Sequence, residues 1–310
     1  MADDFTIFAG TANPALAKAI ASELGVLLGA CAVERFPDGE TSIRLDEPVR
    51  GREVFIIQPT SPPVNENLIE LLAFADACRR ASAERITAIV PYFGYARSDK
   101  RHGRREPITA SMVADLMQAV GIDHVVTVDV HAPQIEGFFR VPMDNLMATP
   151  VLVEALRDTS GMVVVVSPDA GRMKTATDFA HRLKTSVVVL HKRRESGTET
   201  EVTHLVGDVR GRSCLIVDDM ISTGGTMAES IDALLRARAR PEIIVAATHG
   251  LFLPGTREKL SHKAVRTVFV TDTVQAREQN WSQLCVVSIA PLIAAAIRRF
   301  LWNRSLGDLC

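Results

Sequence analysis

The chain lacks several features that would place it in a familiar class of protein. Its 310 residues include five scattered cysteines, none in a C-x-x-C pair of the kind used in metal knuckles and redox motifs. No apolar run approaches the roughly 18 residues that a membrane span needs, and the N-terminus, MADDFTIFAG, opens with acids rather than the bases of a secretory signal. We therefore expect a cytoplasmic protein with reduced thiols and no membrane partner.

A basic excess is also missing, because 35 Lys and Arg residues are set against 37 Asp and Glu residues, for a net charge of −2. A protein that binds the phosphate backbone of nucleic acid normally carries a clear positive charge, so we expect no nucleic-acid partner. The sequence has no G-x-x-x-x-G-K-[ST] motif, so a P-loop kinase is not indicated. Any phosphate chemistry has to depend on local groups.

Short apolar, β-branched runs alternate with helical-period stretches along the whole chain. Runs of this kind without polar alternation are typical of parallel strands covered by helices on both faces, which predicts an α/β fold. With 47% apolar residues, the chain can bury a sizeable core and is long enough for two domains. The predicted strands are 5–10, 53–58, 85–93, 124–130, 162–169, 186–192, 213–220, 242–250, 265–272 and 284–290.

Helix-start signals follow two of these strands. Asn13 and Pro14 supply an N-cap and a proline at the first helical position, and Pro107, with Glu106 beside it, is predicted to open a second helix. Each signal comes soon after a predicted strand. The alternation of strand and helix therefore continues through the first half of the chain.

The boundary between the two domains is predicted near Pro142 and Pro150, which flank a polar turn. We expect an N-terminal domain over 1–148 and a C-terminal domain over 149–290. The last predicted helix, about 291–304, is expected to join the first domain.

The segment CLIVDDMISTGGT, 214–226, carries the clearest chemical signal. An apolar strand ends in two carboxylates, and a glycine-containing loop then leads into a helix, an arrangement in which backbone N–H groups, hydroxyls and a helix N-terminus bind an anion. The paired acids can accept hydrogen bonds from sugar hydroxyls or reach a metal through water. A lone T-G-G-T is equally typical of a polar turn, but the strand and double aspartate favour the anion site. The residues concerned are Asp218, Asp219, Ser222, Thr223, Gly224, Gly225 and Thr226.

This segment resembles the phosphoribosyl-pyrophosphate loop shared by type I phosphoribosyltransferases and ribose-phosphate pyrophosphokinases. The resemblance to the pyrophosphokinases covers essentially the whole chain, and it implies two type I phosphoribosyltransferase-like domains, the first binding ATP and the second binding ribose 5-phosphate. The implied reaction transfers a diphosphoryl group from ATP to ribose 5-phosphate, giving phosphoribosyl pyrophosphate and AMP. The other matching segments are RFPDGE at 35–40, PVNENLIELL at 63–72, PYFGYARSDK at 91–100, REPITA at 105–110, DVHAPQIEGFF at 129–139, SPDAG at 167–171 and HKRR at 191–194.

The resemblance also implies which residues bind ATP. An aromatic ring can stack on adenine, acids can accept hydrogen bonds from its amino group or from ribose, and arginine can bind phosphate with a bidentate fork. Without the family, FPDGE is simply an Asp-Gly turn. The implied ATP residues are Phe36, Asp38, Glu40, Arg97, Ser98, Asp99 and Lys100.

Metal-binding and catalytic residues are implied in the same way. His131 and Asp169 match the residues that hold Mg²⁺, an ion that prefers oxygen ligands and keeps several waters. Lys192 and Arg194 match the catalytic cations, next to a loop spanning roughly 193–201. Taken alone, a histidine at a strand end is more often structural, and a short cationic run is more often a solvated turn.

Five positions depart from the family pattern. Ser222 replaces a loop aspartate, Ser98 a glutamine and Arg172 a glycine, changes that bear on charge in the loop and on nucleotide affinity. Glu136 replaces a glutamine and Gly307 a serine in the segments that form the family's allosteric site. These last two changes add negative charge and remove a donor, so we expect weakened or altered activation by inorganic phosphate.

Two alternatives to the pyrophosphokinase are open at this point. A phosphoribosyltransferase would leave FPDGE, YARSDK and DVH unexplained, whereas a non-catalytic, nucleotide-binding regulatory member of the family would explain Ser222, Ser98 and Arg172. The resemblance further implies a homo-oligomer, typically a hexamer of dimers, with ADP or inorganic phosphate as effectors.

Overall fold

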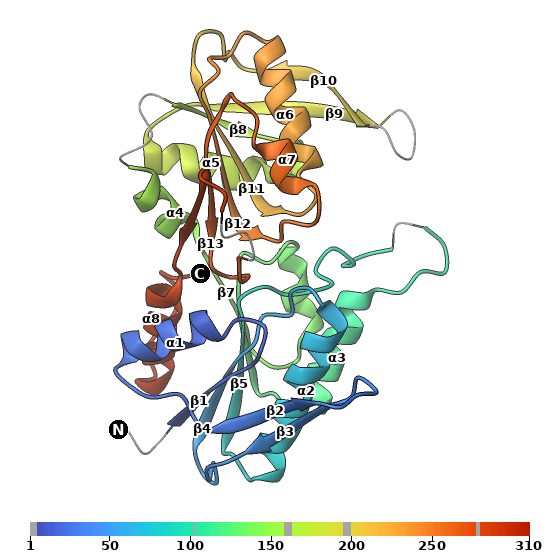
Figure 1. Cartoon of the computed structure of the whole chain (residues 1–310), viewed down its shortest axis with the longest axis vertical. Helices are drawn as coiled ribbons and strands as arrows, with labels where there is room; N and C mark the ends of the chain where they lie inside the picture. The colour runs from blue at the N-terminus through green and yellow to red at the C-terminus, as the bar shows by residue number, and fades with distance from the viewer. Residues whose placement is uncertain (1–4, 102, 158–162, 195–199, 277–279) are drawn as a thin grey trace. The chain divides into compact units, whose positions relative to one another are not determined.

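The computed structural model describes residues 5–101, 103–157, 163–194, 200–276 and 280–310, and of residues 192–194 and 200–204 only the backbone (Figure 1). Its contacts divide the chain into two compact units. Unit 1 comprises Met1–Met147, Thr273–Gln275 and Ser288–Cys310, and unit 2 comprises Ala148–Asp272 and Ala276–Val287. Each unit is built on its own sheet.

The sheet of unit 1 is parallel throughout, in the order β1-β4-β5-β6-β7. Its inner strands are almost wholly buried, as expected when helices cover both faces. The strands are β1 (Phe5–Ala9), β4 (Glu53–Ile57), β5 (Arg85–Val90), β6 (His124–Val128) and β7 (Met143–Leu146).

Helices cover both faces of this sheet. Leu71, Phe74 and Met117 on one face form a buried cluster with alternate residues of β1, β4 and β5. On the other face the ring of Phe300 lies 6.4 Å from that of Phe55, and α1 and α8 lie side by side (Figure 1). The helices are α1 (Pro14–Leu24), α2 (Val64–Arg80), α3 (Thr109–Ala119), α8 (Ala290–Leu301) and the short 3₁₀ helix η1 (Pro133–Phe138), and a separate hairpin joins β2 (Cys31–Arg35) to β3 (Thr41–Leu45).

Unit 2 has a larger sheet in the order β10-β9-β8-β11-β12-β13-β14. All neighbouring strands pair in parallel except β9 and β10, which form an antiparallel hairpin at one edge (Figure 1). The strands are β8 (Val163–Ser167), β9 (Val187–Arg194), β10 (Thr200–Val206), β11 (Ser213–Ile221), β12 (Ile243–Gly250), β13 (Val265–Thr271) and β14 (Leu284–Val287).

Alternate residues of these strands build two separate cores, one on each face of the sheet. Val164 and Ile216 pack with α6 on one face, whereas Val165 and Leu215 pack with α4 and α5 on the other. A strand covered on both faces leaves only its ends for polar side chains. The helices are α4 (Thr149–Leu156), η2 (Ala170–Arg172), α5 (Met173–Leu183), α6 (Gly225–Arg236) and α7 (Thr256–Leu260).

The α/β fold expected from the sequence is confirmed, and a strand overlaps each of the ten predicted segments, with β9 and β11 running one or two residues past the predicted ends. At the start of α1, the Asn13 side chain accepts a hydrogen bond from Leu16 N at 3.2 Å, as the cap signal predicts. The predicted start of α3 at Pro107 is wrong, because Ile108 is not helical (φ −103°, ψ 86°) and the helix begins at Thr109. None of the helices found in the described ranges is long and apolar enough to cross a bilayer.

Two buried cysteines, Cys78 in unit 1 and Cys214 in unit 2, allow a test of the packing of each unit. All five are free thiols, and burial raises the pKa of Cys78 to about 12 and that of Cys214 to about 11. Since the thiolate is the reactive form, iodoacetamide at neutral pH should leave both unmodified in the folded chain. Peptide mass spectrometry would check this, with protein labelled in denaturant as the control. Rapid native labelling of either thiol would contradict the packing.

Candidate functional site

The glycine loop of unit 2 joins the centre of the sheet to a helix. β11 ends at Ile221 and α6 begins at Gly225, so the loop predicted to bind an anion does precede a helix N-terminus. Gly224 takes a left-handed conformation with φ 71°, which a residue with a side chain rarely adopts. A Cβ at this position would also lie 3.1 Å from Thr256 Cγ2. Glycine is therefore favoured here by conformation, and a Cβ would in addition crowd the Thr256 side chain.

Two side chains of α7 donate hydrogen bonds to the backbone of this loop. The buried Thr256 hydroxyl donates a hydrogen bond to the carbonyl of Ser222 at 2.8 Å, and Lys259 Nζ donates to the carbonyl of Thr223 at 2.9 Å. These bonds engage the loop's carbonyl oxygens from the α7 side. Sequence reasoning missed Thr256 and Lys259, because nothing local links them to a loop more than thirty residues earlier.

The two acids at the end of β11 are paired with an arginine. Arg172 Nε lies 3.3 Å from Asp218 Oδ1, and Arg172 Nη2 lies 3.0 Å from Asp219 Oδ2. The exposed fractions of the three side chains are 18%, 10% and 7%, so this cluster is largely removed from water. Burial raises the pKa of Asp218 well above its usual range, the nearby Asp219 carboxyl raises it further, and the Arg172 guanidinium lowers it.

Asp169, a predicted metal ligand, lies in the turn after β8. Its Oδ1 caps η2 by accepting a hydrogen bond from Arg172 N at 3.1 Å, and Ser167 Oγ donates to its carbonyl at 2.7 Å. β8 and β11 are parallel neighbours, paired as far as Val166 and Ile216, so their carboxyl ends lie at the same edge. The structure thereby brings Asp169 and the acid pair to one end of the unit 2 sheet.

The predicted catalytic residues lie on the hairpin at the edge of the same sheet. Lys192 and Arg194 are the third-last and last residues of β9, and in the antiparallel register they pair with Val202 and Thr200 of β10. Their side chains, and residues 195–199 of the predicted loop, lie outside what the structure describes. The placement of the backbone is therefore known, whereas the roles stay predictions.

In unit 1 the segment FPDGE forms the turn of the β2–β3 hairpin. Phe36 N donates a hydrogen bond to the carbonyl of Glu40 at 2.9 Å, and Asp38 Oδ1 accepts one from Glu40 N at 3.1 Å. The Phe36 side chain is 47% exposed, which leaves its ring available for stacking. Asp38 and Glu40 are also exposed, so all three predicted ATP residues are accessible.

An ionic contact holds this hairpin to the rest of unit 1. Arg35, next to Phe36, forms a salt bridge with Glu66 of α2, and its Nη2 lies 3.8 Å from Glu70 Oε2. Glu70 is fully buried and accepts further hydrogen bonds, from Thr11 N at 2.6 Å and from Gln58 Nε2 at 3.0 Å. Sequence reasoning missed this network, which ties the turn to the ends of β1 and β4.

The other predicted ATP segment follows β5 and is only partly exposed. Ser98 Oγ accepts a hydrogen bond from Thr109 N at 3.3 Å and so supports the start of α3. Asp99 is nearly buried and accepts a hydrogen bond from Gln134. Arg97 and Lys100, on either side, are exposed and can reach a ligand.

His131, the other predicted metal ligand, follows β6 of unit 1 and is half-buried. Within the described parts of the chain, no three His, Cys, Asp or Glu side chains come together as a metal site. The carboxylate of Asp169 is a ligand type that Mg²⁺ prefers, whereas an imidazole is a less usual one. Because Mg²⁺ retains several waters and is often held largely by substrate phosphates, it needs few protein ligands.

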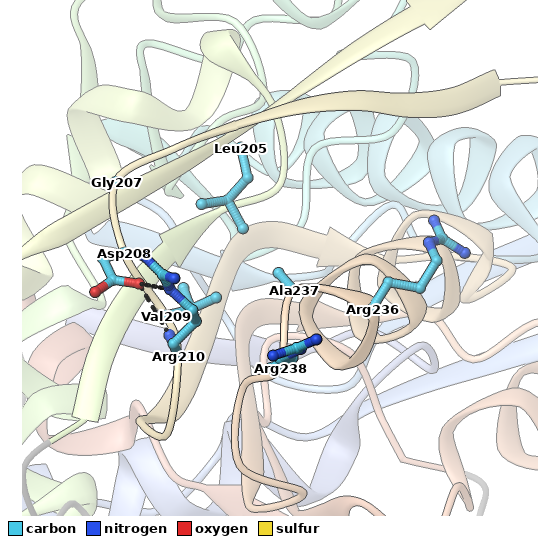
Figure 2. A pocket seen from close by; sticks show the side chains of 8 residues that line it. All are labelled: Leu205, Gly207, Asp208, Val209, Arg210, Arg236, Ala237 and Arg238. Carbon is cyan, nitrogen blue, oxygen red and sulfur yellow. Dashed lines mark hydrogen bonds and ion pairs between the residues drawn. The ribbon is translucent and has the colours of Figure 1, made fainter.

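Unit 2 also has a cavity of about 510 Å³ away from this edge (Figure 2). It lies between the turn Gly207–Arg210 and the last residues of α6, beside the start of β11, which is the opposite end of the strand from Asp218. Arg236 and Arg238 line it, and arginines at a helix C-terminus favourably offset the helix dipole. These residues are therefore explained without a ligand.

Comparison with known proteins gives the same answer along the whole chain. Residues 5–121 match the model of the N-terminal domain of ribose phosphate pyrophosphokinase, and residues 198–310 match that of the phosphoribosyl synthetase-associated domain. Ribose-phosphate pyrophosphokinases from Thermotoga maritima and Haemophilus influenzae are 43% and 45% identical, over 99% of this chain and 98% and 99% of theirs. The crystal structure of phosphoribosylpyrophosphate synthetase from Mycobacterium smegmatis superposes with a TM-score of 0.91 at 41% identity, covering 97% of this chain and 100% of that one.

The loop support can be tested by changing Thr256 to valine. This change keeps the shape of the side chain but removes the hydroxyl that lies 2.8 Å from the carbonyl of Ser222 and 2.6 Å from that of Leu253. The Ser222 carbonyl keeps the backbone N–H of Leu253 at 3.0 Å, so the free energy of unfolding should fall by ~0.5–1.5 kcal/mol, the net worth of one hydrogen bond. Urea unfolding followed by circular dichroism would measure the difference. Thr256→Ser is the control, because it retains the hydroxyl. Equal stability of the two variants would argue against a role for the hydrogen bond.

Proposed function

The chain belongs to the ribose-phosphate pyrophosphokinase family, and from this premise we propose that it transfers the diphosphoryl group of ATP to the 1-hydroxyl of ribose 5-phosphate. The products are phosphoribosyl pyrophosphate and AMP, and the reaction supplies nucleotide biosynthesis. The observation that carries the proposal is the end of β11, where two buried acids precede a glycine loop that opens a helix. A sugar phosphate offers the hydroxyl donors and the anion that such a site binds.

Ribose 5-phosphate is assigned to the loop of unit 2. Its 5-phosphate lies at the N-terminus of α6, where it accepts hydrogen bonds from the backbone N–H groups and hydroxyls of residues 222–226. Ser222, which replaces an aspartate of the family pattern, remains a hydrogen-bond donor. The ring hydroxyls donate to the carboxylates of Asp218 and Asp219. Hydrogen-bond donors thereby hold the phosphate end of the substrate, and hydrogen-bond acceptors hold its ring hydroxyls.

ATP is assigned to the two exposed segments of unit 1. The Phe36 ring stacks on adenine while Asp38 and Glu40 accept hydrogen bonds, and Arg97 binds phosphate oxygens. Lys100 adds positive charge near the same segment. The buried position of Asp99, held by Gln134, supports a positioning role for this carboxylate behind Arg97.

His131 and Asp169 would hold Mg²⁺ together with the phosphates of ATP, and the ion would offset the charge of those phosphates. The chain's own cations do the same for the transferring group. The 1-hydroxyl oxygen attacks the β-phosphorus, the bond from that phosphorus to the α-phosphate oxygen breaks, AMP leaves and the hydroxyl proton passes to solvent. Lys192, Arg194 and Arg97 stabilise the negative charge that accumulates on the phosphate oxygens.

The proposal includes a cytoplasmic homo-oligomer, a hexamer of dimers, with ADP and inorganic phosphate as effectors. Glu136 is exposed on η1 and Gly307 lies in the C-terminal turn, where its N–H donates to Ser305 Oγ at 3.2 Å. Both positions stay assigned to altered phosphate activation. The free cysteines support a reducing compartment.

The direct test is the formation of AMP from ATP and magnesium by the purified chain, with and without ribose 5-phosphate. AMP should appear only with the sugar phosphate. Lys192→Ala should lower kcat by on the order of hundreds-fold or more, because a preorganised charge on the transferring group is lost. Lys263→Ala is the matched control, since Lys263 is an exposed lysine at the opposite end of the unit 2 strands, just before β13. AMP formation at the same rate with and without ribose 5-phosphate would overturn the assignment.

The ATP assignment predicts an effect at Arg35, which holds the hairpin turn and is not among the residues assigned to the nucleotide. Arg35→Ala releases the hairpin turn from Glu66 and Glu70, so the KM for ATP should rise about tenfold, as a loss of one positioning contact of ~1.4 kcal/mol implies, while the KM for ribose 5-phosphate stays unchanged. Steady-state kinetics with each substrate varied would measure both. Arg44→Ala is the control. Arg44 lies on the same hairpin but forms its salt bridge locally, with Asp46 just after β3, at 2.7 Å. An equal rise in both KM values would point to general destabilisation.

A further inference from the structure

We propose that Arg172 is a tethered counter-cation for Asp218 and Asp219, so that this acid pair binds the sugar hydroxyls without a divalent cation of its own. The inference rests on the proposed function, because it takes ribose 5-phosphate as the ligand of the acid pair. It adds a positioning residue that acts through the two carboxylates. It also separates the magnesium requirement of the nucleotide from the binding of the sugar.

The contact geometry supports a bridging role. Two different nitrogens of one guanidinium, Nε and Nη2, reach Asp218 Oδ1 at 3.3 Å and Asp219 Oδ2 at 3.0 Å. A guanidinium keeps its charge at any physiological pH and binds carboxylates in a fixed planar fork. Arg172 therefore holds the two carboxylates in one arrangement.

The backbone around Arg172 places this side chain. Arg172 is the last residue of η2, in the turn that follows β8, and its N–H is bound by the Asp169 carboxylate. β8 is the parallel neighbour of β11, so the turn lies next to the end of the strand that carries the acids. A Cβ at Gly171 would crowd the Asp169 carboxylate, because it would lie 3.1 Å from Asp169 Oδ1. The guanidinium is thus positioned before any ligand arrives.

Charge explains why such a cation is needed. Two adjacent carboxylates that are almost completely buried repel one another and lack solvating water, so without a partner they take up a proton or a metal ion. Arg172 supplies one positive charge at that place, which favours the ionised form of the pair. A divalent cation at the same place would have to compete with a side chain that cannot diffuse away.

The pair still has acceptor capacity for a sugar. Each carboxylate offers about four lone-pair positions, and Arg172 contacts one oxygen of each. Asp218 Oδ1 accepts one further hydrogen bond, from Asp219 N at 2.8 Å. Because a carboxylate accepts several hydrogen bonds at once, hydroxyl groups of the ligand can bind the acid pair while the arginine stays in place.

The decisive measurement is calorimetric titration of ribose 5-phosphate into the full chain without nucleotide, in EDTA and in MgCl₂. The wild-type chain should give the same Kd in both. In Arg172→Ala the acid pair should recruit the metal, so MgCl₂ should tighten sugar binding by about 5- to 150-fold, the range of an ordinary coupling between two sites. By reciprocity, the sugar should strengthen Mn²⁺ binding to this variant by the same factor.

Mn²⁺ titration of the chain without sugar or nucleotide gives an independent readout. Arg172→Ala should bind one more Mn²⁺ than the wild type under these conditions. Arg182→Ala is the matched control. Arg182 lies on the following helix and pairs with Asp178 at 3.0 Å, and both side chains are more than a third exposed. It should behave as wild type in both titrations.

Two further variants keep the test decisive if Arg172→Ala fails to fold. Arg172→Lys retains the charge and should restore sugar binding that is independent of magnesium, whereas Arg172→Gln retains much of the length without charge and should need the metal. Wild-type sugar binding that requires MgCl₂, or binding by Arg172→Gln that does not, would overturn the inference alone. A wild-type chain that forms AMP but binds no ribose 5-phosphate in either buffer would also overturn the inference, whereas a chain that forms no AMP at all would overturn the proposed function instead.

Discussion

The burial of parallel strands on both faces is the constraint on which the rest of this molecule depends. Val164 and Ile216 face one core and Val165 and Leu215 face the other, and polar side chains buried within inner strands, such as Thr87 and Thr127, are small and uncharged. The acids of the candidate site lie at strand ends, and parallel pairing collects the carboxyl ends at one edge. The proximity of Arg172 to the acids of β11 is a direct result of the register between β8 and β11.

Much of the fold could be predicted because the strands are encoded locally. Uninterrupted runs such as MVVVVSPD and EIIVAATHG have few alternatives to a buried strand, and Asn13 followed by Pro14 has few alternatives to a helix start. The same holds for the glycine loop after β11. A hydrophobic strand, two acids and a glycine pair specify a strand, a turn and a helix within thirteen residues, without help from the rest of the chain.

The elements and contacts that were missed depend on tertiary structure. β2 and β3 are half-exposed strands of mixed polarity, and β7 has only four residues. None of these three strands therefore shows a clear pattern of apolar residues in the sequence. The sequence marked Arg172 as unusual, but only the sheet register reveals that it pairs with Asp218 and Asp219. The supports from Thr256 and Glu70 are likewise invisible in sequence, since each joins segments that are more than thirty residues apart.

The return of the chain to unit 1 has a consequence for folding during synthesis. α8 covers the face of the first sheet that carries Phe55, and Met147 N donates a hydrogen bond to the carbonyl of Leu309 at 2.8 Å. The part of this face that α1 does not cover therefore stays exposed until the last helix has left the ribosome. The continuous stretch from 148 to 272 can complete most of unit 2 earlier. The part of the chain made first is thus the part finished last, and its exposed apolar strands depend on rapid completion of the chain to avoid aggregation.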